Sequence, residues 1–324
     1  DNYPQTPVWA YNESIPGTTL RTQQGEGIQL RFENHLAEPS SVHWHGIRLE
    51  NAMDGVSGLT QAGVEQGAHF DYHFRTPDAG TYWYHSHHRS WEQMARGLYG
   101  AMVIEEKDPP ETDLDQVLLL DDWRLQENGE ISNDFGRMMD MSHGGRIGNW
   151  LTVNGVGMDR AVQKVKRNQR LRLRLVNVAN SRILSMTFEG LSGWVVAIDG
   201  QPLETIEVLE EITLAPAQRI DVMVDVVRDS DVQLVLATRE GNTPLMRFEV
   251  EGVHREVGLA PLQPLPANPL APIGSLENVA VTELLMQGGA MGRMQSATYE
   301  GTELGVRELV SKGMVWAFNG VVGM

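Results

Sequence analysis

Apolar and polar residues alternate over several short segments of the chain. Residues 27–34 read Gly-Ile-Gln-Leu-Arg-Phe-Glu-Asn and residues 171–177 read Leu-Arg-Leu-Arg-Leu-Val-Asn, so both end in an Asn that suits a turn. A period of two places apolar side chains on one face of a strand, so we expect both segments to be half-buried strands. With 33 Gly, 15 Pro and many short Val, Ile, Thr and Leu runs, the pattern predicts an all-β protein of sandwiches rather than helices.

One strand-to-turn pattern occurs three times along the chain. The copies read Val-Trp-Ala-Tyr-Asn at 8–12, Trp-Leu-Thr-Val-Asn at 150–154 and Val-Trp-Ala-Phe-Asn at 315–319. Gly155 and Gly320 directly follow the second and third copies. A pattern that recurs in this way marks the same structural unit each time, so the repeat predicts three domains of one kind.

An apolar run accompanies the repeat and helps to set the domain boundaries. Residues 117–120 form such a run before the second copy, and we interpret residues 279–281 as its counterpart before the third. We therefore predict one domain at 1–106, a second at 116–252 and the opening strands of a third at 278–324.

Two histidine pairs are the most specific chemical feature of the sequence. His43 and His45 flank a Trp, and His85 and His87 flank a Ser. In an extended strand residues i and i+2 point to the same face, so each pair predicts a two-pronged clamp for a metal ion. The alternative is that these histidines are structural and only form hydrogen bonds. Two such pairs in one sequence make this alternative less favoured than it would be for a single pair. Imidazole suits copper, zinc, iron and nickel, so the ligand type alone does not name the metal.

The other histidines carry weaker signals. His69 and His73 alternate with aromatic residues, which places both on the polar face of a strand, and we expect them to be solvated. His88 directly follows His87 and therefore faces the other side of a strand, so we expect it at the surface.

The chain has fifteen methionines, and two clusters of them could either bind copper or fill gaps in the packing. Thioethers are soft ligands for Cu(I), but methionine is also a common filler of irregular gaps, so we favour core packing or a flexible loop. The clusters consist of Met138, Met139 and Met141, and of Met286, Met291 and Met294.

Composition narrows the classes of function. A formal charge of -17 argues against nucleic acid as a partner, because a phosphate backbone is bound by clustered Lys and Arg. No apolar run approaches the roughly 18 residues of a membrane span. The first residues lack the features of a signal peptide, so we expect that any signal peptide has already been removed or never existed. The chain has no cysteine, so it cannot by itself supply the thiolate of a blue-copper centre.

Several motifs together resemble the multicopper oxidases. In the first predicted domain the resemblance rests on the two histidine motifs, on Asp54-Gly55 and on the segment 97–104; in the second it rests on 197–203 and 214–222. It covers almost the whole chain. Two further copper motifs of that family, His-Pro-x-His-x-His and His-Cys-His, do not occur in these residues.

The resemblance implies tandem cupredoxin-like Greek-key sandwiches and a trinuclear copper cluster between the first and third domains. By motif position, His43 would bind the type 2 copper, and His45, His85 and His87 would bind the type 3 pair. Asp54 takes the place of an acidic residue beside the water channel and is a proton-relay candidate, with a simple Asp-Gly turn as the alternative. The implied reaction oxidises a phenol or a metal ion and reduces dioxygen to water.

The repeat predicts where ligands are absent. The offset that leads from Asn12 to His43 leads from Asn154 to Ser185, so we expect the second domain to be a spacer and a wall without copper ligands. From Asn319 the same offset runs past residue 324. We therefore expect the rest of the third domain, with the type 1 copper, either on a separate polypeptide after cleavage or in residues not represented in this sequence.

A different class of function is a non-enzymatic copper-binding or scaffold protein of the cupredoxin superfamily. The intact histidine motifs argue against a copper-free scaffold. The family also implies a periplasmic or secreted location.

Overall fold

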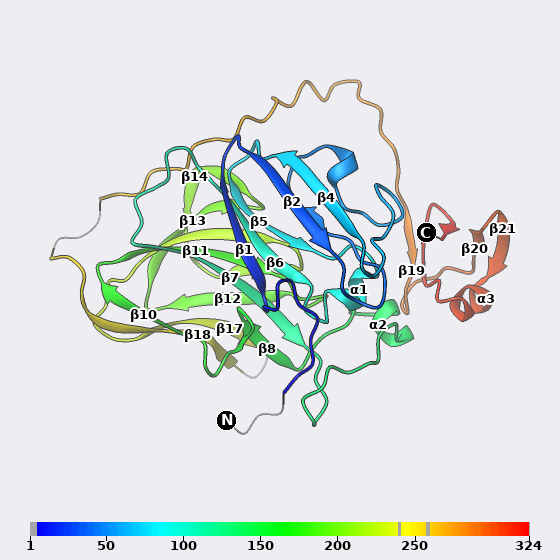
Figure 1. Ribbon diagram of the computed structural model, residues 1–324, viewed down its shortest axis with the longest axis horizontal. Coiled ribbons are helices and arrows are strands. Elements are labelled where there is room, and N and C mark those ends of the chain that lie inside the picture. The colour runs from blue at the N-terminus through cyan, green and yellow to red at the C-terminus, as the bar shows by residue number, and fades with distance from the viewer. Residues whose placement is uncertain (1–4, 239–240, 257–259, 324) are drawn as a thin grey trace. The chain divides into compact units, whose positions relative to one another are not determined.

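The computed structural model describes residues 5–238, 241–256 and 260–323 (Figure 1). The chain divides into two compact units, of which the first comprises Asp1–Ile131 and Gly148–Pro269 and the second Ser132–Ile147 and Leu270–Met324. Strands dominate both units and the helices are short, so the prediction of an all-β protein is confirmed.

The first sandwich of the first unit has two layers around an aromatic core. Trp44, Tyr72, Tyr82 and Tyr84 are buried between the layers together with Met102. One layer is a sheet with the strand order β1 (Gly17–Gln23), β6 (Tyr99–Glu105), β5 (Gly80–His85), β3 (His43–His45), and the other pairs β2 (Gly27–Glu33) with β4 (His69–Arg75). The connections contain a 3₁₀ turn, Asn51–Met53, and the short helix α1 (Ser90–Gln93).

The second sandwich packs two larger sheets around an aliphatic core that includes Leu118, Leu173, Leu214 and Leu234. One sheet has the order β14 (Gln201–Val208), β13 (Ser192–Ile198), β16 (Arg219–Asp225), β11 (Arg170–Asn177), β7 (Leu114–Trp123), β8 (Trp150–Val153), β9 (Val156–Gly157). The other has the order β10 (Val162–Arg167), β18 (Gly241–Val253), β17 (Val232–Thr238), β12 (Leu184–Glu189), β15 (Ile212–Leu214).

The described residues of the second unit form one small sheet and two short helices. Alternation along β22 buries Ala317 and exposes Trp316 and Phe318, so one face of this sheet is covered and the other is open. The Trp316 indole N–H donates to the Met141 carbonyl at 2.8 Å. The strand order is β19 (Met286–Gly288), β22 (Trp316–Phe318), β23 (Val321–Val322), β20 (Ser296–Tyr299), β21 (Thr302–Gly305), with helices α2 (Met138–Ser142) and α3 (Val306–Ser311).

The two alternating segments form strands as predicted, but only one of them is half-buried. Strand β2 alternates between exposed and partly buried positions along its length. Strand β11 is buried at every position, so the prediction of a half-buried strand is wrong there. Its leucines enter the aliphatic core, while Arg172 and Arg174 on the opposite face lie against the first sandwich.

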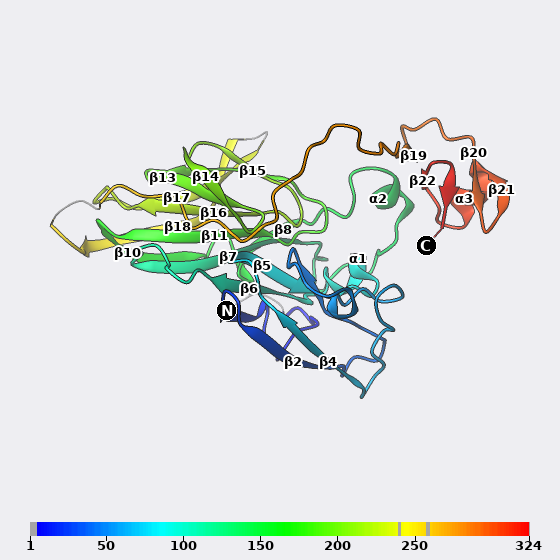
Figure 2. The ribbon, with the colours of Figure 1, turned by 90° about the horizontal axis from the view of Figure 1, so that it is seen from above.

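Ion pairs between the two sandwiches allow these arginines to be buried. Arg172 donates to both carboxylate oxygens of Glu106 at 2.9 and 2.7 Å, and Arg174 donates to the Thr81 hydroxyl at 3.0 Å. Both arginines also contact Asp221. Figure 2 shows β5 and β6 between the pair β2 and β4 on one side and the strands β7 and β11 on the other.

In its second and third copies, the predicted repeat forms the same turn, with the same type of hydrogen bonds from the Asn side chain. Asn154 and Asn319 both have positive φ, of 51° and 47°, and each lies in a hairpin turn. The Asn154 amide bonds to the backbone of Val117 and Leu119, as the Asn319 amide does to Glu283 and Leu285. The counterpart of the run 117–120 is therefore 283–285, and the assignment to 279–281 is wrong.

The first copy keeps the turn and loses the strand. Asn12 has a φ of 52°, but residues 8–11 form no strand and make one isolated bridge between Tyr11 and Ser14. Pro16, which follows this turn, has no N–H with which to pair, and the first strand begins only at Gly17. The boundaries predicted for the three domains remain a prediction.

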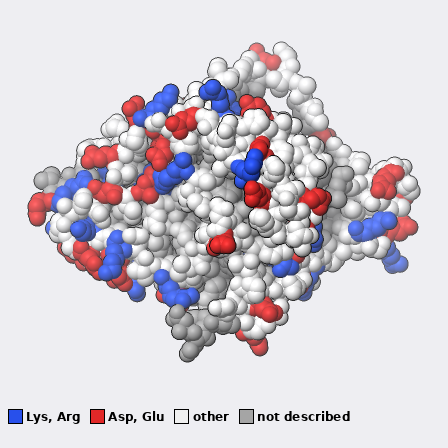
Figure 3. Space-filling model, viewed as in Figure 1, with Lys and Arg blue, Asp and Glu red and all other residues white. Residues whose placement is uncertain are grey.

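Acidic and basic side chains are interspersed on the surface. Figure 3 shows Lys and Arg close to Asp and Glu over much of the face in view. Exposed pairs such as Arg31 with Asp71 and Lys164 with Glu251 belong to this pattern. Among the described residues, no helix combines the length and the apolar character that crossing a membrane requires.

Candidate metal centre

The ladder between β3 and β5 brings the two histidine motifs side by side. His43 lies opposite His85, Trp44 opposite Tyr84 and His45 opposite Trp83. Trp44 is only 3% exposed and packs into the aromatic core, so the histidines on either side of it point away from that core.

The second histidine pair departs from the predicted geometry. Strand β5 ends at His85, so His87 lies beyond the strand and its direction does not follow from strand alternation. Its ring nevertheless joins the others, with centroids 5.3 Å from His43 and 6.1 Å from His85.

The four predicted histidines form one cluster, which we call the histidine cluster: His43, His45, His85 and His87. The His43 centroid lies 5.6 Å from that of His45 and 5.3 Å from that of His85. One ring nitrogen from each of these three side chains lies within 4.8 Å of the others. The spacing fits donors that share metal ions, and imidazole is a common ligand of copper.

The backbone bends at Asp54 and brings Asp54 and Gly55 against the first motif. His43 Nδ1 donates to the Asp54 carbonyl at 2.7 Å, which leaves Nε2 of the same ring as the free donor atom for a metal. Gly55 has a φ of 75°, and a Cβ there would lie 1.7 Å from the Val42 carbonyl oxygen. The Asp54 carboxylate also lies 3.4 Å from His43 Nδ1, and both the proton-relay role and the turn alternative remain predictions.

His45 and His85 present ring nitrogens to each other. His85 Nδ1 donates to the Ser86 carbonyl at 2.9 Å, so its Nε2 carries a lone pair. That Nε2 lies 3.3 Å from His45 Nδ1. The two nitrogens are thus directed at one small volume, where either a shared proton or a cation relieves their repulsion.

Burial keeps these imidazoles neutral. Desolvation lowers the pKa of His45 to about 3, with the charge of Arg219 as the next cause. Desolvation likewise lowers the pKa of His85, and that of His43 against the opposing effect of the Asp54 carbonyl. A neutral ring keeps the lone pair that a metal needs, so His43, His45 and His85 are ready to bind a cation near neutral pH.

Two side chains that the sequence did not single out support the cluster. Trp83 packs its ring on His45 at 5.0 Å between centroids and on His85 at 4.3 Å. Arg219 comes from β16 of the second sandwich and donates to the Thr81 and Asp199 carbonyls. A Cβ at Gly46, which has a φ of 86°, would lie 2.3 Å from Arg219 Nη2. The only sequence signal for Arg219 is its place in the segment 214–222.

The weaker histidine predictions have mixed outcomes. His69 and His73 are exposed on β4, as predicted. His88 is half-buried rather than at the open surface, because its Nδ1 lies 3.0 Å from the Ser57 hydroxyl.

The methionine clusters are mostly exposed, which excludes core packing for most of them. Met138 and Met139 on α2 are 37% and 59% exposed, and Met286 and Met291 are 59% and 93% exposed. Met294 alone of the two clusters packs against the small buried core around Leu309.

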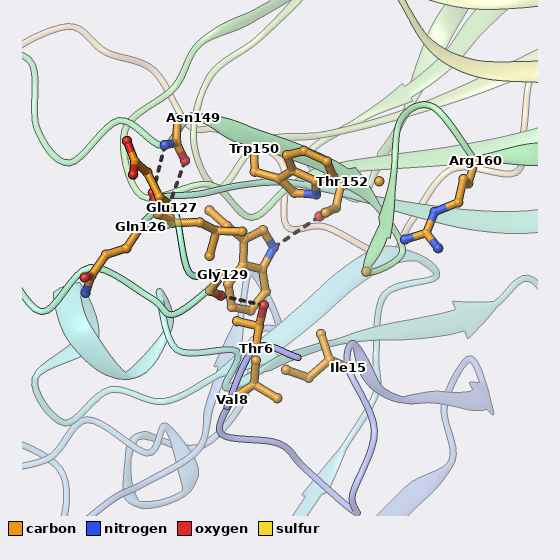
Figure 4. Close-up of a pocket in the computed structure, with 14 residues that line it drawn as sticks. Thr6, Val8, Ile15, Gln126, Glu127, Gly129, Asn149, Trp150, Thr152 and Arg160 are labelled. Carbon is orange, nitrogen blue, oxygen red and sulfur yellow. Dashed lines mark hydrogen bonds between the residues drawn. The ribbon is translucent and has the colours of Figure 1, made fainter. Parts of the chain in front are cut away.

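A separate pocket of about 500 Å³ lies between the N-terminal segment and the start of the second sandwich (Figure 4). Trp123 forms part of its wall, and its indole N–H donates to the Thr152 hydroxyl at 3.2 Å. Thr6 closes one side by donating to the Gly129 carbonyl at 2.8 Å. None of the clustered histidines lines this pocket, and no sequence motif predicted it.

Comparison with known families supports the resemblance seen in the sequence. Two family models, both described as multicopper oxidase, match residues 1–109 and 114–247. Copper resistance protein A of Pseudomonas syringae pv. tomato is 32% identical over 261 residues, which cover 67% of this chain and 42% of that protein. Multicopper oxidase MmcO of Mycobacterium tuberculosis is 32% identical over 286 residues, with 76% and 56% covered. The chain spans about half the length of these curated relatives.

Solved structures agree with this assignment. Lac15 from a marine microbial metagenome is 42% identical and superposes with a TM-score of 0.75, covering 85% of this chain and 69% of that one. A multi-copper oxidase from Pseudomonas thermotolerans is 36% identical with a TM-score of 0.76, covering 82% and 64%.

Proposed function

Because the chain belongs to the multicopper oxidase family, a family of copper-binding proteins with cupredoxin β-sandwiches, we propose that the histidine cluster holds copper. The observation that carries the proposal is the convergence of ring nitrogens of His43, His45 and His85 from two strands on one small volume, where desolvation lowers the pKa of all three rings. The donor set fits copper, since four imidazoles bind it without adding negative charge.

We assign the individual ligands by motif and by hydrogen bonding. His43 would bind a type 2 copper through Nε2, because the Asp54 carbonyl occupies its Nδ1. His45, His85 and His87 would bind a type 3 pair, and the facing nitrogens of His45 and His85 support a shared site. This set amounts to half of a trinuclear cluster.

The reaction we propose for the whole protein is laccase-like: a phenol or a metal ion is oxidised and dioxygen is reduced to water. Bound copper would supply the electron transfer and the Lewis acidity. The residues of this chain hold the imidazoles neutral and in place, and Trp83 covers one side of them. Asp54 would pass protons, since its side chain is 31% exposed to solvent while its carboxylate lies beside His43.

The type 1 copper must come from outside these 324 residues, because they contain no cysteine. We propose that residues not represented in this sequence, either of the same chain or of a separate polypeptide after cleavage, carry it together with the remaining cluster ligands. The open face of the small sheet supports such a partner, since Trp316, Phe318 and Val321 are exposed while Ala317 and Val322 are buried on the other side. The same family relation leads us to propose a periplasmic or secreted location.

Denaturing intact-mass analysis with copper counted on the same sample tests this proposal. A second polypeptide of roughly 110 to 150 residues, the size of one domain, with one Cys and bound copper supports the oxidase. Dioxygen consumption with a phenol then tests the activity.

A single species of 36.1 kDa that binds little copper would contradict the oxidase proposal. A single species that binds copper but consumes no dioxygen would instead support the alternative, a non-enzymatic copper-binding protein. The copper count and the oxygen measurement together separate these outcomes.

A further inference from the structure

Three polar side chains next to the histidine cluster are completely enclosed by protein. Ser40, Ser86 and Gln93 are each 0% exposed. Ser40 lies three residues before His43, and Ser86 lies between His85 and His87. Gln93 is the last residue of α1. A buried polar group without a partner is costly, so their bonding must be complete within the protein.

The amide of Gln93 joins the two histidine motifs. Its Oε1 accepts a hydrogen bond from the Ser86 hydroxyl and another from the Ser40 hydroxyl at 2.8 Å. Its Nε2 donates to the Pro39 carbonyl at 2.9 Å. One side chain therefore binds the segment before the first motif and the centre of the second motif.

This link stands where the backbone ladder ends. The pairing of β3 with β5 covers only the residues from His43 to His45 and from Trp83 to His85. His87 lies past that ladder, although its ring belongs to the histidine cluster. In this segment the Ser86 hydroxyl also contacts the backbone of His88, at 3.3 Å to its nitrogen and 3.4 Å to its carbonyl.

The backbone of the short helix is itself fixed. The Gln93 N–H donates to the Arg89 carbonyl at 3.0 Å, and the Gln93 carbonyl accepts from Leu98 at 3.1 Å. The Leu98 carbonyl in turn accepts from the Ser86 N–H at 3.1 Å. The amide is thus held at a fixed distance from the segment that it binds.

From these contacts we infer that Gln93 is a positioning residue for the copper ligands, one that sets the separation of the two histidine motifs through Ser40 and Ser86. The inference rests on the proposed copper site. Burial makes the link effective, because water does not compete for these bonds. A carbonyl oxygen is needed at this point, since two hydroxyls donate to it at once.

The test compares two variants of the full chain. Gln93→Met keeps the volume of the side chain and removes the acceptor. The matched control is Asn177→Leu in the second sandwich, another amide that is 0% exposed and whose Nδ2 donates to the carbonyls of Arg182 and Leu214. Both variants break buried amide bonds, but only the first lies beside the histidine cluster.

Two readouts are measured on each variant. Titration with Cu(II), followed by electron paramagnetic resonance, reports the affinity and the ligand geometry. Amide hydrogen exchange at Ser86 and His88 reports the order of the second motif without metal. We expect Gln93→Met to weaken Cu(II) binding about 10- to 100-fold, to change the resonance spectrum and to speed exchange at these two amides. Asn177→Leu should leave all three as in the unmodified chain.

A third variant separates positioning from stability. Combining Ser40→Ala and Ser86→Ala with Gln93→Met removes the two hydroxyls that Gln93→Met alone leaves without their acceptor, so the chain should recover part of its stability while Cu(II) binding stays weak. Recovery of both would overturn the inference, as would unchanged Cu(II) binding and exchange in Gln93→Met. If the unmodified chain binds no Cu(II), the proposed function fails, and the exchange rates alone decide whether Gln93 orders the second motif.

Discussion

Strands β2 and β11 each carry an arginine at the same position of the alternating pattern. One of these arginines is exposed to solvent, and the other is buried in protein. Arg31 and Arg174 each lie three residues before the Asn that ends the alternating segment. Each donates two parallel hydrogen bonds to a carboxylate, Arg31 to Asp71 at 2.7 and 2.9 Å and Arg174 to Asp115 at 2.7 Å twice. The Arg31 side chain is 56% exposed, and that of Arg174 is 1% exposed.

The difference shows that the pattern of a strand does not tell how many of its faces are covered. Strand β2 lies at the outside of the first sandwich, so its polar face meets water. Strand β11 lies where the two sandwiches meet, so its polar face must find partners in protein. A charge in water loses little when its partner is removed, whereas a buried charge loses its only compensation.

The largest expected effect comes from breaking the buried pair. Arg174→Met removes both parallel hydrogen bonds to Asp115 and one of the two arginine contacts of the buried Asp221, and we expect it to lower the free energy of unfolding by about 3–5 kcal/mol. Arg31→Met should leave that free energy nearly unchanged. Urea unfolding of both variants measures the difference, and equal shifts would contradict the comparison.

Two carboxyls, the buried Asp121 on β7 and the exposed Asp71 on β4, should change stability with pH in opposite directions. Burial raises the pKa of Asp121, whose carboxylate accepts from the Tyr99 hydroxyl, to about 7. Between the unfolded value of 3.8 and that value the folded chain holds a proton that the unfolded chain has lost, so stability falls as pH rises, by about 1.4 kcal/mol per pH unit. Asp121→Asn should remove this slope in unfolding experiments from pH 4 to 7.

Asp71 provides the contrast for that measurement. Its hydrogen bond from Arg31 lowers the pKa of this exposed carboxyl, so its contribution is present above the unfolded value and is lost as pH falls. Asp71→Asn should therefore change stability only slightly, and the change should shrink as the pH falls below the unfolded value. A slope from pH 4 to 7 that survives in Asp121→Asn would show that another group causes it.

A smaller effect is expected at the hydroxyl that links the sandwiches. Thr81 donates to Asp221 at 2.5 Å and accepts from Arg174 at 3.0 Å. Thr81→Val keeps the shape but removes both bonds, and we expect it to lower the free energy of unfolding by about 1–3 kcal/mol. Thr19→Val makes the same chemical change at an exposed position of β1 and serves as the control in thermal unfolding.

The smallest effect is expected at the exposed histidines. His73 lies on β4, outside the histidine cluster, so His73→Ala should leave Cu(II) affinity within about twofold of the unmodified chain. His45→Ala, which removes a proposed ligand, should weaken it far more. A calorimetric titration of both variants measures the contrast, and similar losses would mean that copper binds elsewhere.

Part of this architecture could be predicted from local sequence alone. Alternation predicted the strands β2 and β11, and the repeat of Asn154 and Asn319 predicted turns that the structure has. The two histidine motifs predicted which side chains cluster. These features depend on neighbouring residues, since the direction of a side chain on a strand and the φ of a turn are set locally.

What the sequence determined, then, is the all-β class, the turns and the candidate ligands; what only the tertiary structure decided is which distant residues complete them. Three contacts join segments far apart in the chain: the pairing of the buried Arg174 with Asp115, the packing of Arg219 against Gly46, and the hydrogen bonds between Gln93 and both histidine segments. No local pattern encodes such contacts, because they form only when sheets pack and exclude water from both sides.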